Sequence, residues 1–212
     1  MITVIINQKQ QQMKKLIFLM VALVSFGMMA QDAQAYLAVN AGASFPGGDI
    51  GDDLELGTGF DFNINAGLRI KIDDDLPIGL GAVVTYGASA STFEDEAGDT
   101  AAFGAGYLGA GPMLTLELGD NLAWDFKPQY VFSLAGVADY EGGDFDETLK
   151  GSGWMLGQSF VFGFDQGFKF SVNLDYLNGK YNSVEVDGES YDFDDALAYS
   201  HFTIGVGARY NF

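Results

Sequence analysis

The residue types that support nucleophilic or metal chemistry are scarce in this chain, which has one histidine, His201, and no cysteine. Ser200 would face the opposite side of a strand from His201, because successive side chains alternate between two faces, so the two cannot form a nucleophile–base pair. The candidate partners on the face of His201 are Asp175 and Tyr181, and neither is a good nucleophile for acyl transfer. We therefore expect no catalytic residue and interpret His201 as a hydrogen-bonded interior residue.

The sequence is rich in aspartate and glutamate, and its formal net charge is −19. Such a charge opposes nucleic acid, and carboxylate oxygens suit calcium or magnesium. The excess lies in four Gly-rich segments, which are 46–57, 91–101, 141–152 and 179–196. No segment has the spaced ligand pattern of a calcium loop, so we favour a solvated acidic surface over a divalent-ion site and expect no cofactor.

The beginning of the sequence has the pattern of a secretory signal peptide. Two lysines follow Met13, an apolar run occupies 16–29, and Ala33–Ala35 fits an A-x-A cleavage site. The apolar run has roughly 14 residues, whereas a helix that spans a membrane needs about 20. We predict a leader, 1–35, whose true start is Met13, followed by one domain, 36–212.

The elements that must position these side chains are β-strands, because apolar and non-apolar residues alternate along the domain. From Phe60 to Ile72, for example, every second residue is apolar. The segments with this pattern are 36–45, 58–72, 77–90, 102–118, 122–140, 153–164, 168–178 and 197–212. Short turns alternate with the four long acidic segments, as in a barrel of the bacterial outer membrane with periplasmic turns and extracellular loops. The sequence predicts an all-β fold, an eight-stranded antiparallel transmembrane β-barrel with up-and-down topology and both chain ends periplasmic.

Side-chain bulk indicates which face of the strands points outward. Large apolar residues share one face of the fifth segment, namely Trp124, Phe126, Tyr130, Phe132 and Leu134, and small or polar residues share the other. The interior of an eight-stranded barrel is only just wide enough for side chains, so we expect the large residues to face lipid. A soluble sandwich or lipocalin-like barrel would place them inside. Gln158 falls on the lipid-facing side, where we expect a β-bulge in preference to a hydrogen-bond partner.

The last segment alternates apolar residues up to Tyr210 and Phe212. It resembles the terminal strand that the outer-membrane barrel assembly machinery reads. Together with the leader and the eight segments, it resembles the OmpA/OmpX/OmpW-type small outer-membrane barrels. This resemblance implies that Tyr210 and Phe212 form the assembly signal.

Charged residues at inward positions are the candidate functional set. A buried charge is costly unless it is paired, so we expect an ionic network between strands, and the OmpA-type lumen is similar in carrying ion pairs that occlude it. The set is Asp61, Arg69, Glu117, Asp125, Lys127, Lys169, Asp175 and Arg209. We favour a polar plug over a narrow or gated pore.

The expected function is that of a non-enzymatic integral outer-membrane protein with a structural or surface-interaction role through its acidic loops. The alternatives are a small-solute pore, an adhesin and, least favoured, a lipid A-modifying enzyme. The expected partners are outer-membrane lipid and lipopolysaccharide, with divalent cations as the bridge in one hypothesis, and the barrel assembly machinery. We expect a monomer that binds no nucleic acid.

Overall fold

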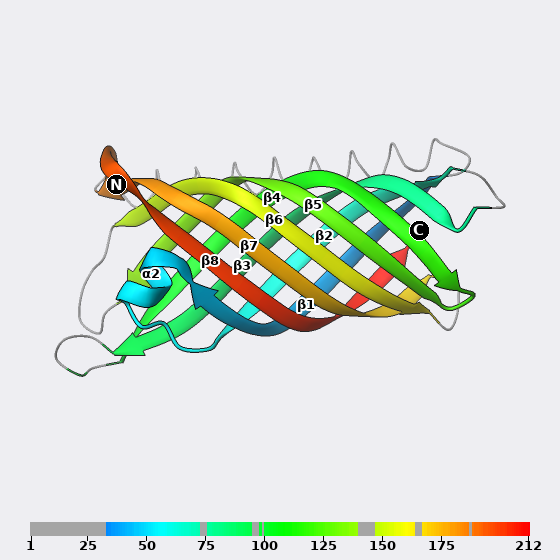
Figure 1. The fold of residues 1–212 in the computed structure, drawn as a ribbon, viewed down its shortest axis with the longest axis horizontal. Helices are drawn as coiled ribbons and strands as arrows, with labels where there is room; N and C mark the ends of the chain where they lie inside the picture. Colours follow the sequence, from blue (N-terminus) through cyan, green and yellow to red (C-terminus); the bar gives the residue numbers. More distant parts are fainter. Residues whose placement is uncertain are drawn as a thin grey trace.

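The computed structural model describes residues 33–72, 76–94, 98, 100–139, 147–163, 167–186 and 188–212. Most of the predicted leader, including Met13, lies outside this part of the chain. Eight antiparallel strands pair in sequence order and close into a barrel (Figure 1), which confirms the predicted fold. The elements are β1 (Ala33–Gly47), α2 (Gly48–Asp53), β2 (Gly59–Lys71), β3 (Ile78–Glu94), β4 (Thr100–Gly119), β5 (Leu122–Asp139), β6 (Thr148–Gly163), β7 (Phe168–Val186) and β8 (Glu189–Asn211).

The barrel closes between its first and last strands. β1 and β8 are antiparallel, with Tyr36 opposite Asn211, and the Phe212 amide donates a hydrogen bond to the Ala35 carbonyl at 2.9 Å. β1 therefore begins where β8 ends, and we call this the terminal end of the barrel. The opposite end carries α2 (Figure 1), and we call it the loop end. Closure satisfies the backbone groups that an open sheet edge would leave unpaired.

The helix α2 has six residues and begins at Gly48, which has a φ of +81°. Its Ile50 side chain is buried, and Asp49 Oδ2 accepts a hydrogen bond from the Ala198 amide at 2.9 Å. These contacts fix α2 against β8 at the loop end. In the described part of the chain, no helix has the length and apolar character needed to cross a membrane.

The strands reach further toward the loop end than the sequence predicted. The segment 179–196, expected to be a loop, is a hairpin in which β7 and β8 remain paired up to Val186 and Glu189. Gly188, with a φ of +85°, lies in its turn. Likewise, 91–94 and 148–152 are strand. The prediction was wrong because acidic side chains were taken to mark loops, whereas a paired strand accommodates carboxylates wherever its side chains are exposed.

The outward face of the barrel is apolar along its length, as predicted. Exposed large side chains occur on all the strands, and Val206 and Tyr130 keep 66% and 61% of their surface exposed. A continuous apolar band of this extent is the outer face of a membrane-spanning barrel.

Leu134 departs from the predicted pattern, because its side chain points inward and is only 1% exposed. On β5, Val131 pairs with Gly109 and Ser133 pairs with Leu108, so Phe132 is an extra residue in the ladder. This bulge shifts the alternation by one position. Phe132 therefore stays outside, at 49% exposed, and Leu134 enters the lumen.

Gln158 lies in regular register, opposite Phe126 on one side and Leu174 on the other. The bulge predicted there was wrong. Gln158 Oε1 instead accepts a hydrogen bond from the Trp124 indole at 3.3 Å. The outward amide thus satisfies an indole N–H that would otherwise lack an acceptor on an apolar face.

Candidate functional site: the lumen and its two ends

The middle of the lumen is filled by amide and hydroxyl side chains from several strands. Asn40 donates to Asn63 Oδ1 at 2.7 Å, and Asn65 donates to the same oxygen at 2.8 Å. Asn173 on β7 donates to Asn40 Oδ1 at 3.0 Å, which connects the two sides of the β1–β8 seam. A cavity in this layer, lined by Asn40, Asn65 and Asn173 among others, has a volume of about 10 Å³, the space of about one water molecule. Asn63 and Asn65 share the parity of Asp61 on β2, and Asn173 shares that of Asp175 on β7, so alternation places all three inside. None of these amides, nor Asn40, was in the predicted functional set.

A buried ion pair crosses the lumen between this layer and the terminal end. Arg209 Nη1 on β8 lies 2.5 Å from Asp125 Oδ2 on β5, and Asp125 Oδ1 accepts a hydrogen bond from Thr115 at 2.6 Å. The Arg209 guanidinium carbon also lies 3.7 Å from the centre of the Tyr36 ring. Each charge of the pair thus has several partners, as a buried charge requires.

A second charge cluster lies at the terminal end. Glu117 binds Arg69 Nη1 at 3.2 Å and Lys71 Nζ at 3.1 Å through its two oxygens. Arg69 Nη2 also donates to Gln34 Oε1 at 2.5 Å. Glu117 therefore links two cations of β2, namely Arg69, which is in the predicted set, and Lys71, which is not.

Lys127 and Asp175, two further members of the predicted set, lie in the buried middle of the lumen. Lys127 Nζ donates to Ser159 Oγ at 2.8 Å, and the Asp175 side chain is buried. A Cβ at Gly157 would lie 2.8 Å from Asp175 Oδ1 and 3.1 Å from Lys127 Cε. Glycine at this position therefore gives these two charged side chains their space.

His201 lies in the part of the lumen nearer the loop end, where it is 1% exposed. Its Nε2 lies 3.6 Å from Asp61 Oδ2 and its Nδ1 lies 3.3 Å from the Tyr199 hydroxyl, while Tyr107 donates to Asp61 Oδ2 at 3.0 Å. The interpretation of His201 as a hydrogen-bonded interior residue is confirmed. Its partners are nevertheless Asp61 of β2 and Tyr199 of its own strand. The expected Asp175 and Tyr181 lie on β7, where the register places Leu177 opposite His201, and this register could not be read from the sequence.

The loop end of the lumen is filled by apolar and aromatic side chains, which the sequence prediction of a polar interior missed. We call this set the loop-end cluster, and it comprises Ile50, Phe93, Ala101, Phe103, Ala105, Tyr107, Val131, Leu134, Met155, Leu177, Tyr181 and Tyr199. Half-buried Leu54, Leu56 and Phe193 pack against it. The sequence contained one indication of this cluster. Phe103 and Tyr107 lie on the same face of β4 as two small alanines, Ala101 and Ala105.

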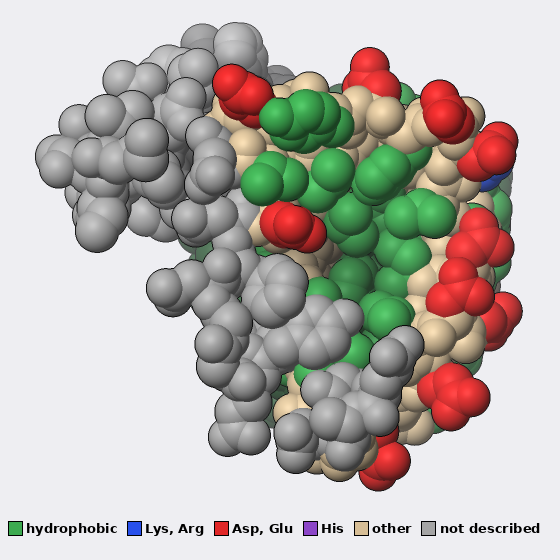
Figure 2. All heavy atoms as spheres, turned by 90° about the vertical axis from the view of Figure 1, so that its left-hand side faces the viewer, with side chains coloured by type: hydrophobic (Ala, Val, Ile, Leu, Met, Phe, Trp, Pro, Cys, Tyr) green, Lys and Arg blue, Asp and Glu red, His purple; other side chains and the backbone are tan. Residues whose placement is uncertain are grey.

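Exposed carboxylates surround the loop end. We call them the acidic rim, and they are Asp49, Asp52, Asp53, Glu55, Glu94, Glu147, Glu189, Asp192, Asp194 and Asp195. Figure 2 shows this end as a hollow with a hydrophobic floor and acidic side chains around it. Within the described residues, no group of three or more His, Cys, Asp or Glu side chains is arranged to hold a metal ion.

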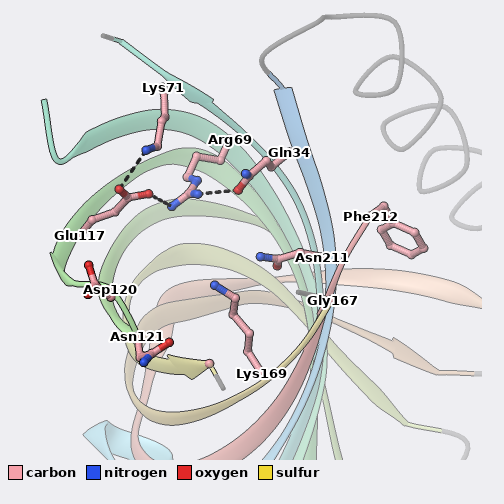
Figure 3. Close-up of a pocket in the computed structure, with 11 residues that line it drawn as sticks. Gln34, Arg69, Lys71, Glu117, Asp120, Asn121, Gly167, Lys169, Asn211 and Phe212 are labelled. Atoms are coloured by element: carbon pink, nitrogen blue, oxygen red, sulfur yellow. Dashed lines mark hydrogen bonds and ion pairs between the residues drawn. The ribbon is translucent and has the colours of Figure 1, made fainter. Parts of the chain in front are cut away.

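The terminal end is hollowed by a second cavity, the vestibule, with a volume of about 660 Å³. Its wall is polar and carries both signs of charge (Figure 3). The lining residues are Gln34, Arg69, Lys71, Glu117, Asp120, Asn121, Gly163, Gly167, Lys169, Asn211 and Phe212. Lys169, the remaining member of the predicted set, lies here and forms no hydrogen bond or ion pair with the described residues.

The barrel was compared with known proteins in sequence and in structure. No family model matches the chain, and no curated protein matches it in sequence. Among solved structures, Neisserial surface protein A superposes with a TM-score of 0.55 at 12% identity, covering 85% of this chain and 99% of that protein. This chain is an eight-stranded β-barrel of the outer-membrane type.

Two more distant outer-membrane barrels also align with the chain. The attachment invasion locus protein of Yersinia pestis, solved with the heparin analogue sucrose octasulfate, gives a TM-score of 0.48 at 13% identity over 86% of this chain and 100% of its own. A major outer membrane protein from Thermus thermophilus gives 0.44 at 16% identity over 84% and 99%.

Proposed function

We propose that this outer-membrane barrel is a non-enzymatic surface-interaction protein with an occluded lumen, and that its loop end is the part that binds. In this proposal the terminal end faces the periplasm and the loop end faces the cell exterior. The protein acts as a monomer among outer-membrane lipids.

The acidic rim around an apolar hollow is the observation that carries the proposal (Figure 2). The rim draws residues from α2, the β3 end and the β7–β8 hairpin, and the loop-end cluster closes the floor beneath it. α2 is held by Ile50, which is buried in that cluster, and by the Asp49–Ala198 hydrogen bond. Carboxylates gathered at this end attract cations, and burial of apolar groups of a partner against the apolar floor is favourable. The surface therefore suits partners that carry cationic groups beside apolar ones.

Transport is the competing function, and the lumen disfavours it. The Asn40–Asn63–Asn65–Asn173 layer leaves a cavity of about 10 Å³, and the Arg209–Asp125 pair and the loop-end cluster fill the space on either side of it. In this proposal, the ionic network is structural.

Catalysis is disfavoured by the surroundings of His201. The hydroxyl that contacts its ring belongs to Tyr199, and among the described residues Ser89 is linked to His201 through that hydroxyl, at 3.1 Å. All of these side chains are buried, so a substrate at the surface would not meet a serine activated by His201.

The partners at the terminal strand follow from its outward side chains. Tyr210 and Phe212 are exposed, and their rings pack edge to face at 5.1 Å. An exposed aromatic pair on the last strand is accessible to the barrel assembly machinery, and we assign the assembly signal to it. Lipopolysaccharide is the expected neighbour of the acidic rim, with divalent cations between the two sets of anions.

The proposal is tested by binding of an amphipathic peptide of leucine and lysine to the purified barrel in lipid nanodiscs. The variant Asp192→Asn/Asp194→Asn/Asp195→Asn removes three rim charges. At roughly 0.3 kcal/mol per exposed charge, it should weaken binding about fivefold at low salt. The matched control replaces the three aspartates at 73–75, between β2 and β3, by asparagine and should leave affinity unchanged. Equal affinity of the rim variant and the wild type, or equal binding of a leucine–glutamate peptide, would refute the proposal.

A further inference from the structure

The vestibule at the terminal end concentrates positive charge in an acidic protein. Arg69 and Lys71 of β2 and Lys169 of β7 line one cavity of about 660 Å³ together with two carboxylates, Glu117 and Asp120. The lining side chains thus carry one more positive than negative charge, although the chain as a whole has a formal net charge of −19. Glu117 is already engaged, because its two oxygens bind Arg69 and Lys71. Asp120, the other carboxylate of the wall, forms no ion pair with Lys169 (Figure 3).

The Lys169 ammonium group is the cation of the vestibule wall that forms no ion pair with the described residues. The charges of Arg209 and Arg69 repel it and those of Glu117 and Asp125 attract it, but it has no hydrogen bond or ion pair with the described residues. Figure 3 shows its Nζ and the side-chain nitrogen of Asn211 pointing into the same space. Like charges that share a partly desolvated site repel one another, and an anion placed among them relieves the repulsion.

The two arginines orient the neighbouring amides as donors. Arg209 Nε donates to Asn211 Oδ1 at 2.8 Å, and Arg69 Nη2 donates to Gln34 Oε1 at 2.5 Å. Each amide oxygen is thereby occupied, and each amide NH₂ group remains as a donor without an acceptor among the described residues. Arg69 Nε is also buried without a partner. The vestibule therefore offers N–H donors from Lys169, Asn211 and Gln34.

This donor excess persists if the leader is cut where the sequence predicts, after Ala35. Cleavage removes Gln34, and Arg69 Nη2 then loses the acceptor that it has in the precursor. The Gln34 amide is then lost as a donor, and Arg69 Nη2 becomes a donor without an acceptor. Lys169, Asn211 and Arg69 therefore still present unpaired N–H groups to the vestibule.

We propose that the vestibule is a binding site for a small oxyanion, a phosphate or carboxylate group, held by Lys169 Nζ and the Asn211 side-chain amide. Oxyanions accept several N–H bonds at once, and such charge-assisted bonds are the strong ones. The vestibule is larger than a single phosphate, so it admits either a hydrated free anion or the end of a longer molecule. The site is independent of the acidic rim and lies at the opposite end of the barrel.

The experiment is a titration of the ¹⁵N-labelled barrel in zwitterionic nanodiscs with sodium phosphate, and separately with sodium acetate, against sodium chloride at matched ionic strength. Saturable shifts at the amides of Gly167, Lys169 and Asn211 are expected with at least one oxyanion. Saturation by phosphate alone, by acetate alone or by both supports the site and assigns its preferred oxygen chemistry. Shifts that do not saturate, or that chloride reproduces, would overturn it.

Two variants separate the site from general charge. Lys169→Gln should weaken binding about tenfold or more, the effect of losing one charge-assisted hydrogen bond. Asn211→Asp should abolish binding, because it keeps the acceptor for Arg209 and puts a carboxylate beside Lys169. Lys180→Gln on β7 toward the loop end is the matched control and should bind as the wild type does. Wild-type affinity in folded Lys169→Gln protein would refute the assignment, whatever the outcome of the peptide test at the rim.

Discussion

Arg209 and Asp125 form an ion pair across the lumen, with 2.5 Å between Nη1 and Oδ2. They belong to β8 and β5, which are not neighbours in the barrel, so the pair braces opposite walls. Thr115 donates to the carboxylate, and the Tyr36 ring and Asn211 contact the guanidinium group. The interior is thus held shut by specific contacts as well as by its narrow diameter.

Removal of one partner of this brace should destabilise the barrel. Asp125→Ala leaves the Arg209 charge buried without its counterion, and we expect a loss of about 3–5 kcal/mol in the free energy of unfolding. Replacing both residues by apolar ones of similar size, Asp125→Leu with Arg209→Met, should cost much less. The measurement is reversible urea unfolding in lipid vesicles, with the exposed Asp120→Asn as control. Wild-type stability of Asp125→Ala would contradict the role of the pair.

The bulge on β5 makes opposite predictions for two neighbouring apolar residues. Leu134 is buried in the loop-end cluster, so Leu134→Ala opens a cavity and should cost about 2–5 kcal/mol. Phe132 faces lipid, and Phe132→Ala removes no packing from the lumen. The same unfolding assay should therefore rank Leu134→Ala as the more destabilising change. A larger loss for Phe132→Ala would indicate the unbulged register.

The orientation of the barrel is open to chemical labelling, because the chain has no cysteine of its own. Ser190→Cys puts a thiol at an exposed position of the β7–β8 hairpin, and Asp120→Cys puts one at the exposed β4–β5 turn. On intact cells, a membrane-impermeant maleimide should label the first and spare the second, while both should react after lysis. The reverse pattern would invert the proposed orientation.

Alternation along the strands predicted much of this structure. The eight strands and the inward positions of Asp61, Arg69, Asp125 and Arg209 follow from parity alone, because a strand sends successive side chains to opposite faces. Pairings such as Arg209 with Asp125 could not be predicted, since they depend on register between distant strands.

The errors of the sequence prediction have local physical causes. One extra residue at Phe132 reversed the direction of Leu134, and hairpin pairing turned the supposed loop 179–196 into strand. The loop-end cluster was missed because bulk was taken to exclude aromatic residues from the lumen. Tyr107, Tyr181 and Tyr199 fit there because small residues face them: a Cβ at Gly136 would lie 2.8 Å from the Tyr181 hydroxyl, and Tyr107 packs against Gly87.

The central claim is that the barrel is closed and acts through its surface, and single-channel recording tests it most directly. The purified wild-type protein would be inserted into a planar lipid bilayer and the current followed under an applied voltage. We expect rare, small openings at most, because amides, the Arg209–Asp125 pair and the loop-end cluster fill the lumen. A steady, large conductance would show an open path and contradict the account.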